Sequence, residues 1–560
     1  MTDPNNNSPG RGRTVFLETF GCQMNELDSE LVAGQLARLG YQFSTERDTA
    51  DVVLFNTCSV REQAEQKVWS RLGELRKRKD KDPGVVVGVL GCMAERDGTD
   101  LIKRMPVVDV MCGPAELDKL PSLLDNAVRT GASLAGDDGT TVALQGSASR
   151  RSATLAAAED RLELLDLSRS VSPTDAGSRR SAYVRITRGC NKFCTYCVVP
   201  HTRGAEVHRP PDHIIDECKR LADEGVLEIT LLGQTVNHYR FEHDHAVVRD
   251  GVVQPQKGRS FKGGHRRDPL GGERVTTFAD LLYRIHEEVP AIQRLRFVTS
   301  YPRDFGDDVL EVIRDCPRIC RYLHVPAQSG SDRVLAKMNR GYTTGEYYEF
   351  IDRARHYLDQ PEIGRPLTLS GDIIVGFPTE TDQEFAQTVE LVERSRYKNC
   401  FIFKYSPRPG TVAYDKIADD ISDKVKRERN NHLLAVQARI SDELSREQVG
   451  RSFDCLVEGV SRKQLQRAGR SLGEIRAQKA VSGHGAVALT VGGKDPTAVL
   501  DEPSETAAGG TVQLSARTDG DMIVFFDAPA AEADALTGTI TRLRVTDADH
   551  LSLQGERVET

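Results

Sequence analysis

The stretch YVRITRGCNKFCTYCVVP, residues 183–200, joins a short apolar strand to three closely spaced cysteines. The strand YVRIT (183–187) ends just before Cys190, Cys194 and Cys197, which form a C-x3-C-x2-C run. Three thiolates at this spacing can bind three irons of a cubane cluster and leave the fourth iron open to another ligand. Structural zinc usually takes four protein ligands, so three cysteines favour an iron–sulfur cluster over zinc.

The sequence that follows alternates between apolar strands and amphipathic helices. Six such units predict an open or partial (β/α) barrel, in which reactive groups lie on loops at the C-terminal ends of the strands. The predicted strands are 183–187, 226–232, 294–298, 321–325, 369–376 and 401–405. The stretch 240–275 is rich in Gly, His and Arg and is predicted to be a surface insertion.

The same alternation occurs earlier in the chain and predicts a parallel α/β sheet that ends near residue 130. Each of its three apolar strands ends in a cysteine, and the strands and cysteines are 14–22 with Cys22, 50–58 with Cys58, and 84–92 with Cys92. Because the C-terminal ends of parallel strands meet at one edge, we expect the three sulfurs to lie close together and to bind a second cluster. The alternative is that they are ordinary buried cysteines.

At 560 residues the chain is too long for one ordinary domain. The fold class is α/β with a small terminal β-barrel, because short alternating strands follow a single helix predicted at 424–451. The expected units are an N-terminal domain at 13–130, a linker or insertion at 131–180, a partial (β/α)6 barrel at 181–445 and the β-barrel at 448–550, with an insertion at about 462–512.

Composition excludes several classes of protein. Hydrophobic residues make up 39% of the chain and the net charge is −8, which predicts a soluble globular protein and not a general binder of polyanions. No stretch approaches the ~20 apolar residues of a membrane span, and the N-terminus lacks the apolar segment of a secretory signal. We therefore expect a cytosolic protein without a membrane partner, in which the twelve cysteines serve as metal ligands more readily than as disulfides.

Seven motifs resemble one known family. TRGCNKFCTYCVVPHTRG (187–204) is similar to the cluster motif of radical S-adenosylmethionine (SAM) enzymes. The segments FGCQMNELDSE, FNTCSVREQAEQKVWSRLG, LGCMAER, LLGQTVNHY, LHVPAQSGSDRVLAKMNRGYT and DIIVGFPTET resemble the tRNA methylthiotransferase branch of those enzymes. The likeness runs from about Thr14 to Gly450, and the terminal barrel is similar to the RNA-binding TRAM module of the family.

The resemblance implies a role for both groups of cysteines. Cys190, Cys194 and Cys197 would hold a [4Fe–4S] cluster that binds SAM and generates a 5′-deoxyadenosyl radical. A second [4Fe–4S] cluster, the auxiliary cluster, would carry the sulfur to be inserted, and its ligands would be Cys22, Cys58 and Cys92. A second SAM would supply the methyl group. The radical must meet the sulfur before solvent quenches it, so we expect both clusters to face one closed cavity.

Four further residues are candidate SAM contacts, because SAM is a zwitterion with a ribose and an adenine and needs polar groups on the upper loops of the barrel. Gly233 and Gln234 follow the second strand, Ser329 follows the fourth and Asp372 lies in the fifth. The alternative for each is a polar turn residue or a satisfied buried one. Arg203 and Arg209 are predicted to meet an RNA phosphate, a carboxylate or solvent.

The leading hypothesis is an enzyme that adds a methylthio group to carbon 2 of N6-isopentenyladenosine beside the tRNA anticodon. The alternatives are methylthiolation of threonylcarbamoyladenosine in tRNA or of a ribosomal protein. A zinc-stabilised, non-catalytic RNA-binding protein is the alternative from a different class. The expected partners of the enzyme are tRNA, an electron donor and a sulfur donor, and the expected state is a monomer.

Overall fold

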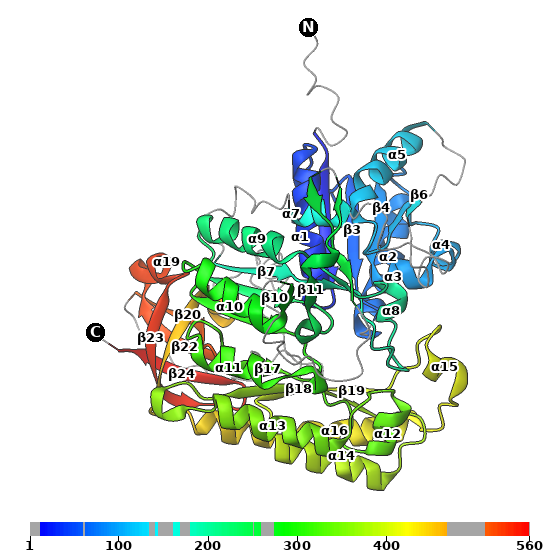
Figure 1. The fold of residues 1–560 in the computed structure, drawn as a ribbon. Coiled ribbons are helices and arrows are strands. Elements are labelled where there is room, and N and C mark those ends of the chain that lie inside the picture. The colour runs from blue at the N-terminus through cyan, green and yellow to red at the C-terminus, as the bar shows by residue number, and fades with distance from the viewer. Residues whose placement is uncertain are drawn as a thin grey trace.

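The computed structural model describes residues 12–59, 62–133, 141–143, 161–167, 180–249, 251–258, 274–467 and 510–558. Figure 1 shows an N-terminal α/β domain in blue, a central sheet with helices in green and yellow, and a small β-barrel in orange and red. Within the described residues, no helix combines the length and the apolarity that crossing a membrane would require.

The N-terminal domain is built on a six-stranded parallel sheet, as the alternation of strands and helices predicts. The two central strands are apolar on both faces and fully buried, because helices cover both sides. In order across the sheet, the strands are β2 (Gln42–Phe43), β1 (Thr14–Phe20), β3 (Val52–Thr57), β4 (Val86–Gly91), β5 (Val110–Cys112) and β6 (Thr141–Ala143). The helices are α1 (Gln23–Arg38), α2 (Glu62–Lys79), α3 (Cys92–Asp97), α4 (Thr99–Arg104) and α5 (Leu120–Ser133).

The register of this sheet aligns the ends of three neighbouring strands. Phe20 of β1 pairs with Thr57 of β3, and Thr57 pairs with Gly91 of β4. The residues that follow these three therefore form a row along the C-terminal edge of the sheet, which brings together the three positions where cysteines occur.

The central domain is an open barrel of six parallel strands, as predicted. Two three-stranded groups lie side by side and are joined by a bridge between Leu295 and Ile319. The strands are β7 (Ser181–Arg185), β10 (Glu228–Leu232), β16 (Arg294–Val298), β17 (Tyr322–His324), β18 (Thr368–Val375) and β19 (Asn399–Lys404). The covering helices are α9 (Pro211–Asp223), α10 (Phe278–Glu288), α11 (Asp307–Asp315), α13 (Thr344–Leu358), α14 (Asp382–Ser395) and α16 (Asp423–Arg446).

Helix α16 ends earlier than the predicted boundary at residue 451. Gly450 takes a positive φ of 85°, and its N–H donates to the carbonyl of Val545 in the C-terminal barrel. This contact redirects the backbone out of the helix.

Side-chain alternation gives the open barrel an apolar outer face and a polar inner face. Ile229, Leu231 and Phe297 point outward and pack in the main core with the helices. Residues between them turn inward, and among these Glu228 pairs with Arg296 of the neighbouring strand at 2.7 Å. The interior is therefore charged at this N-terminal end of the strands, where Arg517 of the small β-barrel also pairs with Glu228.

The C-terminal domain is a closed five-stranded barrel, as predicted. Its strands, in order around the barrel, are β20 (Ser452–Val460), β21 (Thr511–Arg517), β22 (Ile523–Pro529), β24 (Ser552–Arg557) and β23 (Ile540–Ala548). The strand β21 was not predicted, and most of the predicted insertion at 462–512 lies outside the described residues.

The small barrel contacts the N-terminal ends of the central strands. Arg294, the first residue of β16, donates to the carbonyl of Arg517 at 2.5 Å, and Thr368, the first residue of β18, donates to the carbonyl of Gly520 at 2.8 Å. The opposite, C-terminal ends of the strands are left for the N-terminal domain (Figure 1).

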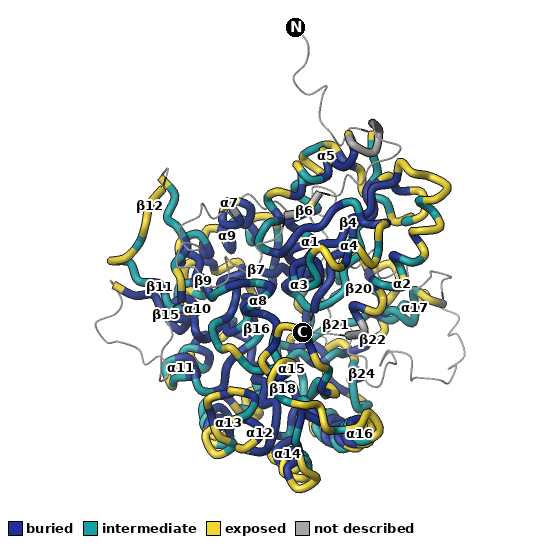
Figure 2. Tube along the Cα trace, turned by 90° about the vertical axis from the view of Figure 1, so that its right-hand side faces the viewer, coloured by how far each residue is buried: buried dark blue, intermediate teal, exposed yellow. Residues whose placement is uncertain are grey.

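The predicted insertion at 240–275 contains several short strands: β11 (Arg240–Glu242), β12 (Val248–Arg249), β13 (Val252–Val253), β14 (Gln256–Lys257) and β15 (Val275–Thr277). The hairpin around β12 projects from the surface and is exposed (Figure 2). The start of the insertion is not a surface feature, because Phe241 is buried in the main core.

Candidate metal centres

The first three cysteines lie on one tight loop between β8 (Thr187–Arg188) and α8 (Val199–Thr202). The N–H of Cys197 donates to the carbonyl of Cys194 at 3.0 Å, and the N–H of Cys190 donates to the carbonyl of Gly204 at 3.2 Å. Gly189 takes a positive φ of 67°, and a Cβ there would lie 2.1 Å from the carbonyl oxygen of Ala205. The loop therefore turns at a position that only glycine fits.

The donor set of this loop fits a cubane cluster. Burial raises the pKa of the Cys190 thiol well above its usual range, and burial together with the neighbouring Cys194 raises that of Cys197 to about 12. The two thiols are therefore neutral in the metal-free chain, and cluster binding must release their protons. Three cysteines on one loop supply three ligands of a [4Fe–4S] cluster and leave one iron for another molecule.

The second group of cysteines lies at the aligned strand ends of the N-terminal sheet. The N–H of Cys58 donates to the carbonyl of Phe20 at 2.9 Å, and a Cβ on Gly21 would lie 2.5 Å from the Cβ of Cys58. Cys92 begins helix α3 and lies near Cys22, whose charge contributes to the raised pKa of Cys92. The structure thus brings together three cysteines that are separated by up to seventy positions in the chain.

Two buried asparagines support this second group, and neither was predicted from the sequence. Asn25 donates its side-chain N–H to Asn56 Oδ1 at 3.0 Å, and the Sγ of Cys22 donates to Asn25 Oδ1 at 3.3 Å. Both asparagines are fully buried. Asn56 is the next-to-last residue of the otherwise mostly apolar strand β3. A buried amide needs hydrogen-bond partners, so this asparagine is the signal that could have identified the asparagine pair from the sequence.

The two groups of cysteines face each other across the domain boundary. Helices α3 and α8 lie side by side, and Cys92 is close enough to Cys197 to contribute to its raised pKa. Burial raises the pKa of Cys92, and the nearby positive charge of Arg203 opposes this rise. The ends of the parallel strands in both domains therefore point at one shared region.

Arg203 connects the loop of the first group to the helix that follows Cys22. Its Nη2 lies 2.8 Å from Asp28 Oδ2 on α1, and the other oxygen of Asp28 lies 3.2 Å from Arg185 on β7. All three side chains are buried. Of the alternatives raised for Arg203, the structure shows a carboxylate partner.

Arg209 also pairs with carboxylates, and one of them comes from the stretch predicted to be a linker. Helix α7 (Arg161–Leu167) places Glu163 2.9 Å from Arg209 and also 2.9 Å from Arg188, next to the cysteine loop. Burial opposes ionisation of Glu163, but Arg209 and the other cations lower its pKa to about 2. The stretch 131–180 thus contributes both β6 and a buried anchor.

The predicted SAM contacts Gly233 and Gln234 lie directly after β10, at the C-terminal end of the barrel. A Cβ on Gly233 would lie 2.1 Å from Thr187 Oγ1, so the absence of a side chain allows close approach of the two segments. Gln234 is partly exposed. Both residues stay predictions as SAM contacts.

Ser329 and Asp372 differ in their surroundings. Ser329 is fully buried, accepts the N–H of Ser331 at 3.2 Å and lies 3.5 Å from Thr388 Oγ1 on α14, so its hydroxyl already has protein partners. Asp372 keeps 25% of its side chain exposed and lies 3.5 Å from His324 Nε2. The two residues also stay predictions, and the accessible carboxylate of Asp372 fits a role in ligand binding better.

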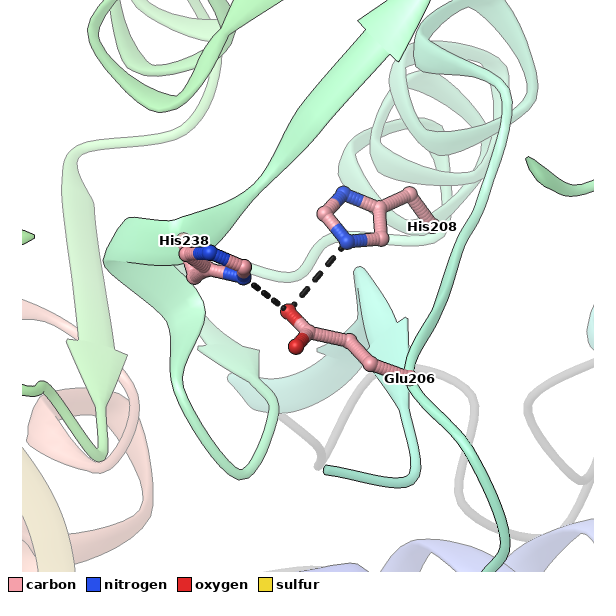
Figure 3. Close-up of side chains that lie close together, drawn as sticks. All are labelled: Glu206, His208 and His238. Carbon is pink, nitrogen blue, oxygen red and sulfur yellow. Dashed lines mark hydrogen bonds and ion pairs between the residues drawn. The ribbon is translucent and has the colours of Figure 1, made fainter. Parts of the chain in front are cut away.

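Three further potential ligands, Glu206, His208 and His238, lie close together and are buried (Figure 3). Glu206 follows Ala205, whose carbonyl lies against Gly189 of the first cysteine loop. Glu206 Oε1 lies 2.8 Å from His238 Nδ1 and 3.2 Å from His208 Nε2. The Nδ1 of His208 accepts the N–H of Arg240 at 2.7 Å, so a neutral His208 ring carries its proton on Nε2. A protonated nitrogen does not bind a metal ion, and we interpret the group as a hydrogen-bonded carboxylate.

The charge of this carboxylate acts on the cysteine loop. Burial would raise the pKa of Glu206, but hydrogen bonds from His208 and His238 hold it below its usual range. The resulting negative charge contributes to the raised pKa of Cys190. Glu206 therefore helps to keep the metal-free thiol protonated.

Comparison with known proteins shows the family of this chain. Residues 184–392 match the model of the Radical SAM superfamily, and residues 14–113 match that of the Uncharacterized protein family UPF0004. The chain is thus a radical SAM enzyme, and membership implies SAM and a [4Fe–4S] cluster as cofactors. A solved structure, the radical S-adenosylmethionine methyltransferase TsrM from Kitasatospora setae, matches with a TM-score of 0.45 and 14% identity over 72% of this chain and 77% of that chain.

Curated relatives define the family more narrowly. The tRNA-2-methylthio-N(6)-dimethylallyladenosine synthase of Rhodopirellula baltica is 43% identical over 80% of this chain and 85% of its own length. The synthases of Neisseria gonorrhoeae and Aquifex aeolicus are 40% and 37% identical over 80% of this chain, and the matches cover 89% and 88% of their lengths. The chain belongs to the family of tRNA-2-methylthio-N(6)-dimethylallyladenosine synthases.

Proposed function

We propose that this chain adds a methylthio group to carbon 2 of N6-isopentenyladenosine, also called N6-dimethylallyladenosine, next to the anticodon of tRNA. The relatives at 37–43% identity carry this substrate in their name. The observation that carries the proposal is the convergence of two separate cysteine groups on one region, where α3, which begins with Cys92, lies beside α8, which follows Cys197. An enzyme that inserts sulfur at an unactivated carbon needs a radical source and a sulfur source in the same cavity.

Each cysteine group then has its own task. Cys190, Cys194 and Cys197 hold the [4Fe–4S] cluster that binds SAM, and Cys22, Cys58 and Cys92 hold a second, auxiliary [4Fe–4S] cluster. When bound, SAM and the two clusters supply the radical, the sulfur and the methyl group. The chain itself binds and orients these groups and keeps water away from them.

The residues between the two groups perform that orienting role. The Arg203–Asp28 pair fixes α1, and with it Cys22, against the loop that carries Cys197. The side chains of Arg203 and Asp28 are buried, so this contact between the two groups is shielded from water, whereas Cys22, Cys194 and Cys197 are partly exposed. A dry, fixed cavity protects a carbon-centred radical from quenching before sulfur is transferred.

The remaining parts of the proposal concern partners. The C-terminal barrel binds tRNA, in keeping with its resemblance to the TRAM module. A protein electron donor reduces the SAM-binding cluster, and a sulfur donor restores the auxiliary cluster. We expect the chain to act as a monomer in the cytosol, where its tRNA substrate is found.

Mass spectrometry of tRNA nucleosides tests this function. Cells that lack the gene for this chain should accumulate N6-isopentenyladenosine and lose its 2-methylthio derivative. Reintroducing the unmodified chain should restore the derivative, whereas a chain with Cys190, Cys194 and Cys197 replaced by Ala should not. An unchanged pool of the methylthio nucleoside in the deleted strain would reject the substrate assignment.

A further inference from the structure

The loop that carries the first cysteine group is held by a segment far away in the sequence. This segment, residues 337–340, follows helix α12 (Asp332–Lys337). The N–H of Thr195 donates to the carbonyl of Met338 at 3.0 Å, and the Thr195 hydroxyl donates to the carbonyl of Lys337 at 2.8 Å. Asn339 donates to the carbonyl of Phe193 at 3.0 Å. The segment thus fixes the loop between Cys190 and Cys197.

Arg340, the last residue of this segment, touches a cysteine sulfur directly. Its Nη1 lies 3.3 Å from the Sγ of Cys194. Its Nε donates to the Tyr342 hydroxyl at 2.9 Å, and its Nη2 donates to the carbonyl of Pro326 at 3.1 Å. The guanidinium also lies over the ring of Tyr301, 4.8 Å from the centroid. These contacts orient the guanidinium so that the Nη1–H points at the Sγ of Cys194.

Arg340 is a buried cation whose titratable neighbours are phenols and a thiol. The residue is 7% exposed, and among the described residues no carboxylate pairs with it. A buried guanidinium without an anionic partner is costly, because its charge has lost the solvation of water. The nearby side chains with acidic hydrogens are Tyr342, Tyr196, Cys194 and Tyr301. Of these, a cluster-bound cysteine thiolate is the one that supplies a negative charge at neutral pH.

We propose that Arg340 tunes the redox state of the SAM-binding cluster by donating a charged N–H···S hydrogen bond to the Cys194 thiolate. This inference rests on the proposed assignment of Cys190, Cys194 and Cys197 as its ligands. Reduction adds an electron to the cluster and makes its sulfurs more negative. A cationic donor at sulfur therefore stabilises the reduced form more than the oxidised form and raises the reduction potential. Arg340 makes electron uptake from the donor easier.

The test uses a chain with Cys22, Cys58 and Cys92 replaced by Ala, so that one cluster gives the signal. The reduced fraction of the cluster is measured by electron paramagnetic resonance (EPR) at a series of fixed potentials. We expect Arg340→Met to lower the ratio of reduced to oxidised cluster about tenfold at a given potential, which equals 59 mV for a one-electron couple. Arg303→Met is the matched control, because Arg303 donates to the carbonyl of Gly341 next to Arg340 and has no sulfur contact.

The possible results distinguish the role of Arg340 from the assignment of Cys190, Cys194 and Cys197 as cluster ligands. A chain that lacks the second cysteine group and binds no iron would reject the proposed ligands of the first cluster. A chain that binds about four irons, with the same potential before and after Arg340→Met, would overturn the role of Arg340 alone. An equal shift in Arg303→Met would also overturn it, because the effect would then be general.

A second measurement applies if Arg340→Met does not fold. This measurement uses the chain in which Cys22, Cys58 and Cys92 are replaced by Ala and Arg340 is intact. Its arginines are labelled with 15N, and the reduced cluster is studied by pulsed EPR without SAM. An N–H···S bond to the cluster should give a 15N coupling to the reduced cluster. The absence of a 15N coupling would contradict the proposal.

Discussion

The two cysteine groups reach the same region by different routes. Cys190, Cys194 and Cys197 lie within eight residues on one loop, and a distant segment, residues 337–340, holds that loop in place. Cys22, Cys58 and Cys92 come from three strand ends, and the register of the sheet aligns them. The first group is local in sequence and needs support from afar, whereas the second is scattered in sequence and is supported by its own sheet. Substitutions that disturb the support of one cysteine group and leave the support of the other unchanged test this difference.

The largest effects should follow removal of a whole group. Replacing Cys22, Cys58 and Cys92 with Ala should lower iron from about eight to about four per chain. It should abolish the methylthio nucleoside while SAM is still cleaved to 5′-deoxyadenosine. Replacing Cys190, Cys194 and Cys197 with Ala should abolish both reactions. Iron analysis and chromatography of the products check this, and equal loss of SAM cleavage in the two variants would contradict the division of tasks.

Breaking the contact between the groups should have the next largest effect. Arg203→Met leaves the buried Asp28 with Arg185 as its remaining cation, so the cost should stay below the roughly 3–5 kcal/mol of a buried charge left with no partner. The free energy of unfolding should fall by less than this amount, and less methylthio product should form per SAM cleaved. Arg129→Met removes an exposed pair with Asp125 and should change stability by less than about 1 kcal/mol. Equal effects of the two substitutions would show that the contact between domains is unimportant.

The anchor on α7 should make stability depend on pH. The pKa of Glu163 is lowered from 4.5 to about 2, so its contribution, on the order of 3 kcal/mol, is complete above about pH 4.5. The contribution is lost as the pH falls from about 4.5 toward 2, because the unfolded chain then binds a proton on Glu163 that the folded chain does not. Urea unfolding at several pH values should show a gap between the unmodified chain and Glu163→Gln that narrows over this range. A gap that stays constant would contradict the ionised Glu163.

Glycine substitutions should have smaller effects, each on its own group. Gly21 has a φ of 144° and leaves no room beside Cys58, and Gly189 turns the loop before Cys190. Each Gly→Ala change should cost roughly 1–2 kcal/mol or more and should lower the iron held by the adjacent group. Gly73→Ala, in helix α2 with open space around it, is the control and should leave the iron content unchanged. Loss of iron from the wrong group in either variant would contradict the separate support of the two sites.

Strong local patterns made much of this architecture predictable from the sequence. The apolar strands ending at Cys58 and Cys92 predicted the row of sulfurs, because successive parallel strands that are each followed by a helix end at the same edge of the sheet. The C-x3-C-x2-C loop was recognisable because its ligands are neighbours in the chain. The open barrel and the small β-barrel followed from the strand periodicity.

The supporting contacts were not predictable, because they depend on pairing between distant segments. Nothing in the local sequence distinguishes the buried Arg203 from an exposed cation, since its partner Asp28 is 175 positions away. Glu163 lies in a stretch whose composition is typical of a linker, and only tertiary packing reveals it as an anchor. Arg340 was part of a recognisable motif, but its contact with Cys194 requires the folded chain.

The central claim is that the two clusters face each other in one cavity. EPR spectra of the fully reduced protein test it, because two paramagnetic clusters at short range split or broaden each other's signals. The account predicts that the spectrum of the unmodified chain differs from the sum of two other spectra. One is that of the chain with Cys22, Cys58 and Cys92 replaced by Ala, and the other is that of the chain with Cys190, Cys194 and Cys197 replaced by Ala. A spectrum equal to that sum, with about eight irons bound, would place the clusters too far apart and contradict the account.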